Sequence, residues 1–483
     1  MSGLFGVVST IDCPQTLFFG TDYQSHLGTE KAGMAVMNHR IYRSIHNIST
    51  SQFKSRFIDE INNMKGTMGI GVISDNEPQP IIISSSFGTF ALVSSGLLAN
   101  KNQLARQIMK QGGSFSELSG GEINPTEVIG KIIAQKENVV DGIKHFYSMM
   151  KGSLCLLVLT RKGIYAARDP LGRTTLILGK NGSSLAVSSE SCAFPNLGYQ
   201  IKKELLSGEI ILLTKNGLVR SQSPGSDRKK VCSFLWIYTG YPASSYEGLS
   251  VEQVRERCGI NMAKNDKVKA DFVTGIPDSG IAHAIGYSIG SGIPYRRALV
   301  KYTPGYGRSY TPPQQETRNR IAQLKLIPIP EIIKGKKIII CDDSIVRGTQ
   351  LKNQAIKKLW DCGAKEIHVR IACPPLLFPC PYLLSIRKKG ELAARRAIQN
   401  AFSQKFSSVS PFLDSSTTEY KEMIEYIRQE LGVTSLAYQT VPSMIDAISL
   451  PKNQLCLHCW QGKTKDLIMA EMPGNDPGSE CGL

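Results

Sequence analysis

Up to about residue 220, short apolar runs alternate with turn residues. Segments such as GTMGIGVISD, GSLCLLVLT and GEIILLTKNG are rich in aliphatic and β-branched residues. The pairs Asn181-Gly182 and Asn216-Gly217 are typical of tight hairpin turns. Two helical stretches, 102–111 and 126–135, interrupt the strand pattern. The pattern predicts an α+β domain built mostly on antiparallel sheets.

After a polar stretch at 221–230, which predicts a linker, the pattern changes. Helical segments alternate with continuous apolar runs, namely ADFVTGIP, PYRRALV, KKIIICDD and EIHVRIACPP. Such runs are typical of buried parallel strands in an α/β domain. We therefore expect one domain over residues 1–225, a second over 226–470, and a disordered tail over 471–483.

Composition narrows the class of protein. The chain has 483 residues, 41% hydrophobic and 20% charged, which is typical of a globular protein of two or three domains. No apolar run reaches the length of a membrane span, and the first residues lack the features of a signal peptide, so we expect a cytoplasmic protein without membrane contact. The net charge of +17 is spread along the chain without interleaved aromatic residues. This distribution argues against a nucleic-acid partner and favours an anionic small-molecule substrate.

The segment from Ile338 to Thr349 carries the clearest candidate chemistry. A buried strand over 338–341 ends at Asp342 and Asp343, at the edge where open α/β sheets bind ligands. Residues 344–349 then form a turn into a helix that starts near Gln350, and free backbone N–H groups there suit a phosphate. Two adjacent carboxylates suit sugar hydroxyls or Mg²⁺. From these residues alone, an ordinary strand–turn–helix with surface acids remains an alternative.

The same segment, CDDSIVRGT, resembles the signature of type I phosphoribosyltransferases, and most closely that of the glutamine phosphoribosyl pyrophosphate (PRPP) amidotransferases. GIPDSGIAHAIGYSIGSGIPYRRALVK is similar to the segment of that family that holds the serine of the Mg²⁺ site, here Ser279. KYTPGYGRSYTPPQQETRNRIAQLKLIP resembles the loop that closes over PRPP. The resemblance implies Mg²⁺ at Ser279, Asp342 and Asp343, and catalysis at Asp342, Asp343 and Arg308. The PRPP contacts it implies are Lys301, Arg308, Arg318, Lys325, Asp342, Asp343, Ser344, Ile345, Val346, Arg347, Gly348 and Thr349. A solvated loop is the alternative for its cations.

Four of the twelve cysteines form a second candidate site. Cys232, Cys380, Cys456 and Cys459 fall where the iron–sulfur members of this family place their cluster ligands. The resemblance therefore implies a structural [4Fe–4S] cluster. A Zn²⁺ site and buried, unligated cysteines remain alternatives, because one C-x-x-C spacing does not identify a metal.

The first domain resembles the N-terminal-nucleophile glutaminase domain of the same family. SGLFGV is similar to its CGxxG start, SHLGTEKAG to its HRGQEGAG, and YAARDPLGR and SSESCAF to its later strands. The groups that perform its chemistry are replaced. Ser2 stands at the nucleophilic cysteine, Ser74 at the arginine for the substrate carboxylate, Ser95 at the oxyanion asparagine, and Pro125 at the aspartate for the glutamine amine. We expect a degenerate, inactive glutaminase.

Taken together, the resemblance implies an N-terminal-nucleophile hydrolase-like sandwich followed by an α/β type I phosphoribosyltransferase domain. We expect an amidophosphoribosyltransferase-like enzyme of purine-type chemistry that uses PRPP and Mg²⁺ and transfers the phosphoribosyl group to ammonia or another amine. A homo-oligomer and an ammonia-supplying partner are also expected. Two alternatives remain: a non-catalytic PRPP- or nucleotide-sensing paralogue that regulates or scaffolds a partner enzyme, and an N-terminal Ser amidase.

Overall fold

The apolar run of β9 (Gly152–Thr160) is buried on both faces in the computed structural model. Leu154 and Leu156 pack against helices, whereas Cys155 and Leu157 pack into the core between two sheets. This division follows from the alternation of side chains across a strand. The structure describes residues 2–75, 77–119, 121–222, 229–302, 326–382, 389–402 and 408–462.

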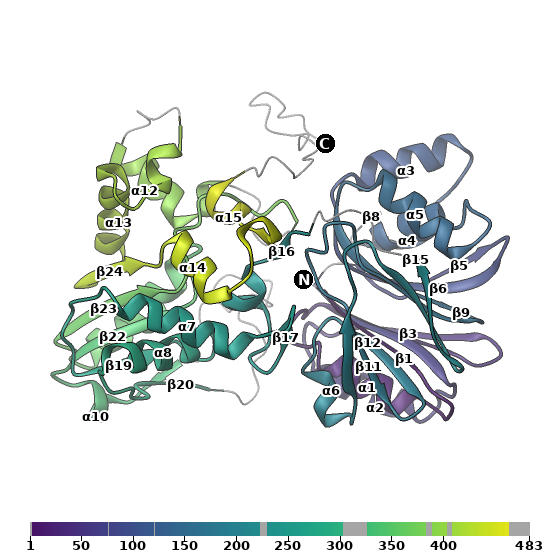
Figure 1. Ribbon diagram of the computed structural model, residues 1–483, viewed down its shortest axis with the longest axis horizontal. Helices are drawn as coiled ribbons and strands as arrows, with labels where there is room; N and C mark the ends of the chain where they lie inside the picture. Colours follow the sequence, from purple (N-terminus) through teal and green to yellow (C-terminus); the bar gives the residue numbers. More distant parts are fainter. Residues whose placement is uncertain are drawn as a thin grey trace.

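Two antiparallel sheets form the first domain (Figure 1). Their strand orders are β13-β11-β12-β1-β4-β2-β3 and β15-β14-β10-β9-β6-β5. The first sheet comprises β1 (Ser2–Val8), β2 (Lys31–Met37), β3 (Ile41–Asn47), β4 (Met68–Ser74), β11 (Ile177–Asn181), β12 (Ser184–Ser188) and β13 (Gln200–Glu204). The second comprises β5 (Ile81–Ser85), β6 (Gly88–Leu98), β9, β10 (Gly163–Ala167), β14 (Ile210–Thr214) and β15 (Gly217–Gln222).

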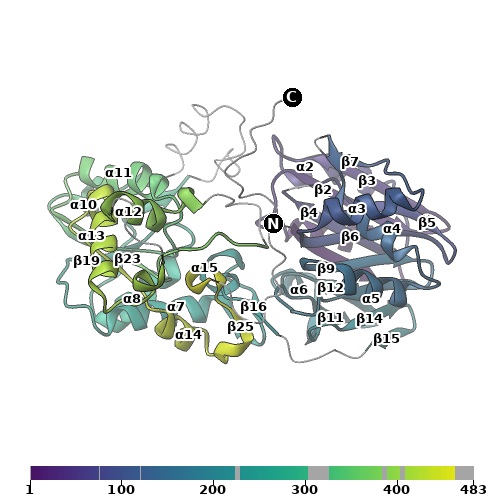
Figure 2. The same ribbon diagram turned by 90° about the horizontal axis from the view of Figure 1, so that it is seen from above.

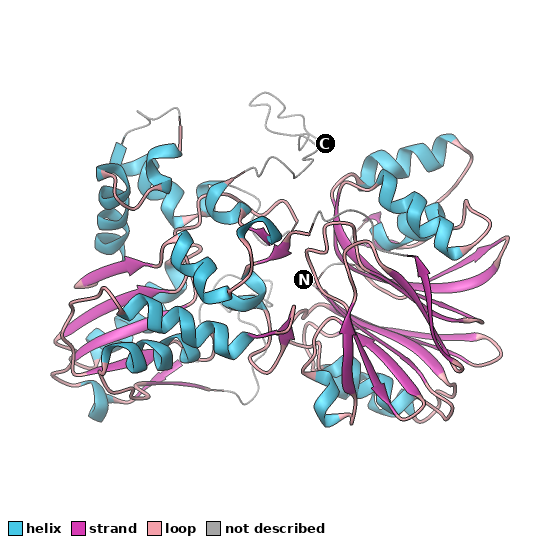
Figure 3. Cartoon of the chain, viewed as in Figure 1, coloured by secondary structure: helices cyan, strands magenta, loops and turns pink. Residues whose placement is uncertain are grey.

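Helices cover the outer face of each sheet and complete four layers (Figure 3). The first sheet packs against α1 (Pro14–Asp22), α2 (Phe53–Ile61) and α6 (Ala193–Asn196), and the second against α3 (Lys101–Lys110), α4 (Pro125–Ile133) and α5 (Val139–Met149). A short hairpin, β7 (Leu118–Ser119) and β8 (Glu122–Ile123), precedes α4. The predicted sandwich is confirmed.

The second domain is built on a parallel sheet of order β19-β22-β23-β24. In β22, Ile339 and Cys341 pack towards α7 and α8, and Ile338 and Ile340 belong to the larger core that includes α11, α12 and α13. Both faces of this strand are therefore buried, as its apolar run predicts. The strands are β19 (Phe272–Gly275), β22 (Lys337–Asp342), β23 (Glu366–Ile371) and β24 (Ser435–Tyr438). The helices are α7 (Val251–Ala263), α8 (Ile281–Ser291), α10 (Pro330–Ile333), α11 (Lys357–Asp361), α12 (Ala393–Phe402), α13 (Thr418–Leu431), α14 (Val441–Ile448) and α15 (His458–Gln461).

Several elements differ from the prediction. PYRRALV does not add a full strand to the parallel sheet: Tyr295 makes a single bridge to β19, and β20 (Leu299–Lys301) pairs antiparallel with β21 (Leu326–Pro328). Arg296 and Arg297 are exposed, which is incompatible with a strand covered on both faces. In the first domain, the structure adds α1, α2, α5 and α6 to the two helices that were predicted.

The two domains are joined by short pairings around the linker (Figure 2). β16 (Val231–Cys232) lies parallel to β25 (Leu455–Cys456), close to the end of the described chain. On its other side, Lys230 N–H donates to Leu171 O at 2.7 Å and Cys232 N–H donates to Arg173 O at 2.9 Å. Through Lys230 and Cys232, the end of the linker thus contacts the first domain on one side and the C-terminal segment on the other. Other short elements include β17 (Ser245–Tyr246), β18 (Leu249–Ser250) and the π-helical turn Leu235–Thr239.

Most of the predicted linker lies outside the described residues, as does the predicted tail at 471–483. Among the helices in the described part of the chain, none is long and apolar enough to cross a membrane.

Candidate functional site

The Asp342–Asp343 pair lies where β22 ends, at the carboxyl edge of the parallel sheet. Both side chains are buried, and Asp343 N–H donates to Asp342 Oδ1 at 3.0 Å. The Ser344 hydroxyl donates to Asp343. The pair lines a cavity of about 940 Å³. Buried carboxylates at this edge of an open sheet are placed to meet a ligand.

Burial raises the pKa of both carboxyl groups, and for Asp342 the neighbouring Asp343 raises it further. Ser279 opposes this effect through hydrogen bonding to both carboxylates, and the Arg255 guanidinium opposes it at Asp343. Arg255 is itself fixed by three backbone carbonyls, those of Trp236, Tyr238 and Gly240. Two like charges held together in a buried site favour a ligand that brings cations or hydroxyl donors.

The turn after the aspartates has the geometry expected of a phosphate cradle. In the part of the chain that the structure describes, the amide N–H groups of residues 344–347 donate to no protein partner. Gly348 adopts φ +77°, a left-handed conformation that favours glycine. The helix that follows begins with a π-helical turn, Leu351–Ile356, and continues as α11. Free amides at the start of a helix suit an anion.

The other predicted PRPP residues divide into two groups. Ser279 and Lys301 line the same cavity as the aspartates, and Lys301 Nζ lies 2.6 Å from Asp278 Oδ2. Arg308, Arg318 and Lys325 lie outside the described residues. No group of three or more His, Cys, Asp or Glu side chains among the described residues has the arrangement of a metal-ion site. Two carboxylates with a serine still fit Mg²⁺, which takes its remaining ligands from water and substrate phosphates.

Three of the four positions where we expect glutaminase residues to be replaced meet at one point. Ser2 lies opposite Ser74 in the β1–β4 register, and its hydroxyl donates to Ser74 Oγ at 3.0 Å. Ser95 Oγ donates to the carbonyl of Ser2 at 2.5 Å. Pro125 is separate: it is the first residue of α4 and is not part of the cavity lining. The three serines thus bond to one another, and no cationic or amide side chain stands at these positions.

The four predicted cluster cysteines also converge. Cys232 and Cys456 are register partners in the β16–β25 pair, and Leu377 and Phe378 donate their N–H groups to Cys459 O. Burial, together with neighbouring thiols of the set and against the opposing effect of Arg173, raises the pKa of Cys232. The same causes raise the pKa of Cys456 to about 12. Cys459 and Cys380 hydrogen bond to each other. Four thiols from three segments of the chain therefore lie near one another, although among the described residues they do not form a group with the arrangement of a metal-ion site.

One cavity connects these sites. Ser2 and Ser95 line one part of it, Asp342 and Asp343 another, and Cys232, Cys380 and Cys459 its wall. The cavity therefore extends from Ser2 and Ser95 to the candidate PRPP site.

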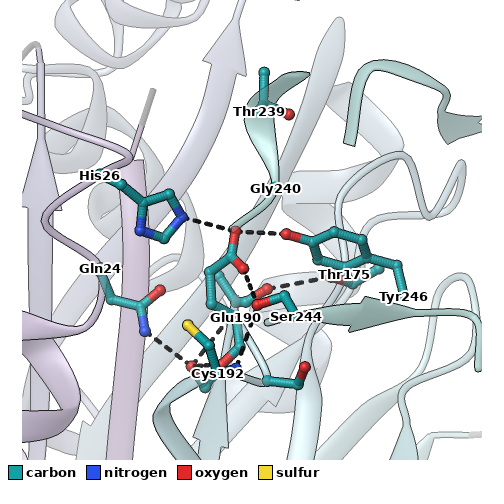
Figure 4. Close-up of polar contacts among 12 residues, drawn as sticks. Gln24, His26, Thr175, Glu190, Cys192, Thr239, Gly240, Ser244 and Tyr246 are labelled. Carbon is teal, nitrogen blue, oxygen red and sulfur yellow. Dashed lines mark hydrogen bonds and ion pairs between the residues drawn. The ribbon is translucent and has the colours of Figure 1, made fainter. Parts of the chain in front are cut away.

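A buried carboxylate that sequence reasoning missed holds the domains together beside this cavity (Figure 4). Glu190, directly after β12, accepts from Tyr246 Oη at 2.5 Å and from the Ser244 hydroxyl, while His26 Nε2 lies 3.1 Å away. Burial and the proximity of Glu190 raise the pKa of Tyr246 well above its usual range. In the sequence, Glu190 is marked only by its place in the SSESCAF segment. That segment does not reveal Ser244 and Tyr246, which lie more than 50 positions later in the chain.

Comparison with known proteins gives a consistent result. Residues 67–196 match the model of a family described as "Glutamine amidotransferase domain". The amidophosphoribosyltransferase of Methanocaldococcus jannaschii is 31% identical over 96% of this chain and 97% of that protein, and that of Bacillus subtilis is 30% identical over 95% and 93%. A solved structure of glutamine PRPP amidotransferase from B. subtilis, complexed with ADP and GMP, superposes with a TM-score of 0.82 at 30% identity and covers 96% of this chain and 97% of that one. A second, described as the allosteric regulatory enzyme of purine biosynthesis, also has a TM-score of 0.82, at 29% identity, and covers 96% of each chain.

Proposed function

Because this chain belongs to the amidophosphoribosyltransferase family, whose members are glycosyltransferases, we propose that it transfers the phosphoribosyl group of PRPP to ammonia or another amine without a glutaminase of its own. The proposal includes a role in purine biosynthesis, as stated for one of its structural relatives. The observation that carries it is the buried Asp342–Asp343 pair beside free amides in a cavity of about 940 Å³.

In this proposal, the roles follow from charge and geometry. Asp342 and Asp343 bind the ribose hydroxyls, and residues 344–349 bind the 5′-phosphate through backbone N–H groups. Ser279 and the aspartates would hold Mg²⁺, which would supply positive charge for the pyrophosphate group. Arg308, Arg318, Lys325 and Lys301 supply further positive charge. The amine displaces pyrophosphate at C1, so positioning and electrostatic stabilisation provide most of the catalysis.

The loss of glutaminase chemistry is proposed from the Ser2, Ser74 and Ser95 contacts. A glutaminase of this type needs a nucleophile, an oxyanion donor and charged groups that hold the substrate. Here Ser2 Oγ donates to Ser74 Oγ, and Ser95 Oγ donates to the backbone of Ser2 itself. Residues 67–196 match the glutamine amidotransferase domain family, and the contacts of these three side chains are what argues against its chemistry.

The proposal is tested by incubating the protein with PRPP and Mg²⁺ and measuring pyrophosphate release. Ammonia and glutamine are supplied in parallel reactions. We expect turnover with ammonia, rising with pH as more of it is the free base, and none with glutamine. The double variant Asp342→Asn, Asp343→Asn should lose this turnover, and Asp361→Asn, exposed at the end of α11, should retain it. Unchanged turnover in the double variant would contradict the PRPP site, and turnover with glutamine would contradict the missing glutaminase.

We further propose that Cys232, Cys380, Cys456 and Cys459 hold a [4Fe–4S] cluster. A four-thiolate set is the usual ligand set of such a cluster, and the buried, unpartnered Nε of Arg173 beside it suits an anionic group. The cluster would be structural, linking β16 to the C-terminal segment. Anaerobically purified protein should be brown and contain about four iron atoms; colourless protein with stoichiometric zinc would contradict the cluster.

The organisation of the chain is part of the same proposal. We assign residues 1–225 to the glutaminase-like domain and 226–470 to the phosphoribosyltransferase domain. We also propose a cytoplasmic homo-oligomer, with ammonia taken from solution or from a partner enzyme.

A further inference from the structure

Arg173 is a buried cation in an unusual environment. It lies between β10 and β11 in the first domain, and its side chain is 2% exposed. Its guanidinium lies over the ring of Tyr382, 4.7 Å from the centroid. Within the described residues, its Nε has no hydrogen-bond partner. Burying a charge without a partner is costly, so this arrangement requires a compensating group.

The neighbouring Arg168 shows how the same type of side chain is satisfied when its role is structural. Arg168 forms an ion pair with Glu247 at 2.8 Å, and it donates to the carbonyls of Thr174, Leu205 and Gly172. Arg173 makes no comparable set of contacts in the part of the chain that is described.

The groups that face Arg173 are the thiols of the four-cysteine site. Arg173 lines the same cavity as Cys232, Cys380 and Cys459. Asp169 is engaged elsewhere, accepting from Leu171 N–H at 2.9 Å and Ser153 Oγ at 3.1 Å. The backbone of Arg173 belongs to the same site, since its carbonyl accepts from Cys232 N–H at 2.9 Å.

We infer that Arg173 is the counter-charge of the four-thiolate metal site, supplied to it by the first domain. The inference rests on the proposed cluster at Cys232, Cys380, Cys456 and Cys459. Four thiolates carry more negative charge than a cluster core neutralises, so the loaded site is anionic and lies in a buried environment. Arg173 provides the compensating charge, which favours retention of the metal and the more reduced, more negative state of the cluster.

The variants that test this separate charge from shape. Arg173→Met keeps much of the side-chain length and removes the charge, Arg173→Lys keeps the charge, and Arg161→Met makes the same change at an exposed position in the turn between β9 and β10. Each is purified anaerobically, and iron content, the rate of loss of visible absorbance in air and the midpoint potential are measured. If the role of Arg173 were purely structural, Arg173→Met would not shift the midpoint potential. Arg173→Lys would then not restore the wild-type behaviour.

We expect Arg173→Met to lose its cluster roughly tenfold faster than wild type, because the thiolates lose their counter-charge. Its reduction equilibrium should shift at least about tenfold towards the oxidised state, which is about 59 mV for a one-electron couple. Arg173→Lys should stay close to wild type, and Arg161→Met should be indistinguishable from it. Equal cluster-loss rates and potentials in wild type and Arg173→Met would overturn the role of Arg173 alone. Wild-type protein without iron would instead overturn the proposed cluster, and the inference with it.

Discussion

At the scale of single residues, Ser2 shows how one substitution is accommodated by its neighbours. A hydroxyl is a weaker nucleophile than a thiol, and here it already donates to Ser74 Oγ. Ser95, at the predicted oxyanion position, donates to the Ser2 carbonyl and so stabilises the start of β1, where a glutaminase would carry its nucleophile. In the function we propose, the three serines therefore hold this part of the structure together and perform no glutaminase chemistry.

Restoring the thiol should therefore not restore the reaction. We expect Ser2→Cys to release no more ammonia from glutamine than wild type, measured with PRPP present. Loss of one oxyanion donor alone costs about 100- to 1,000-fold in rate, and the charged groups that bind glutamine are replaced as well. Robust activity in the wild type would show that Ser2 is a working nucleophile, and activity only in Ser2→Cys would show that the other groups survive elsewhere in the chain.

The aspartate pair predicts a conflict between stability and function. Burial and the neighbouring carboxylate raise the pKa of Asp342 in the folded protein above its unfolded value. The folded state therefore binds more protons, and stability falls as pH rises from the unfolded pKa through the folded one. At neutral pH, the unfolding free energy of Asp342→Asn should exceed that of the wild type by about 1 kcal/mol or more, so the variant should unfold at a higher temperature. The difference should vanish below about pH 4. Thermal unfolding of the ligand-free protein across this range measures it, with Asp361→Asn as the control.

The sequence alone identified some of the site residues and missed others. Asp342, Asp343 and the cysteines could be selected because their chemistry is local or matches a family pattern. Glu190 and Arg173 could not, because their importance depends on contacts with Tyr246, Tyr382 and distant thiols that only the fold brings together.

At the scale of elements, the turn between β22 and the following helix depends on one backbone conformation. Gly348 has φ +77°, and a side chain there costs about 1–2 kcal/mol. Gly348→Ala should therefore displace the free amides and raise the KM for PRPP several-fold. Gly292→Ala is the matched control, because Gly292 has φ +72° and open space around it but is not part of the cavity lining. It should lose similar stability without a change in KM; equal KM effects in both variants would contradict the phosphate role of the turn.

Elements were predictable where one signal dominated. The apolar run of β9 identified a strand, and that of β22 identified a strand buried on both faces. Helix α5 was missed, although Asn138 caps it by accepting from Asp141 N–H, which is a recognisable helix-start signal. β24 was missed because Ser435–Tyr438 is a partly exposed edge strand without a continuous apolar run.

At the scale of the whole molecule, Glu190 makes the domain contact sensitive to a single hydroxyl. Tyr246→Phe keeps the ring and removes the donor at 2.5 Å. We expect a loss of about 1.5–3 kcal/mol in unfolding free energy, because the hydrogen bond is buried and its acceptor is charged. Tyr42→Phe, at a half-exposed tyrosine in β3, should change stability little. Denaturant unfolding compares the two, and equal stabilities would contradict a strong Tyr246–Glu190 bond.

The pairing of β16 with β25 also determines the order in which the molecule can be completed. The Ser233 hydroxyl donates to Cys456 O across 223 positions of the chain. During synthesis, the first domain can fold while the rest is still being made, since all partners of its sheets are already present. The linker must wait for the last described strand before it finds its partner, so closure of the four-cysteine site is a late, high-contact-order step. Chains truncated before Leu455 should therefore contain a folded first domain and an open interdomain junction.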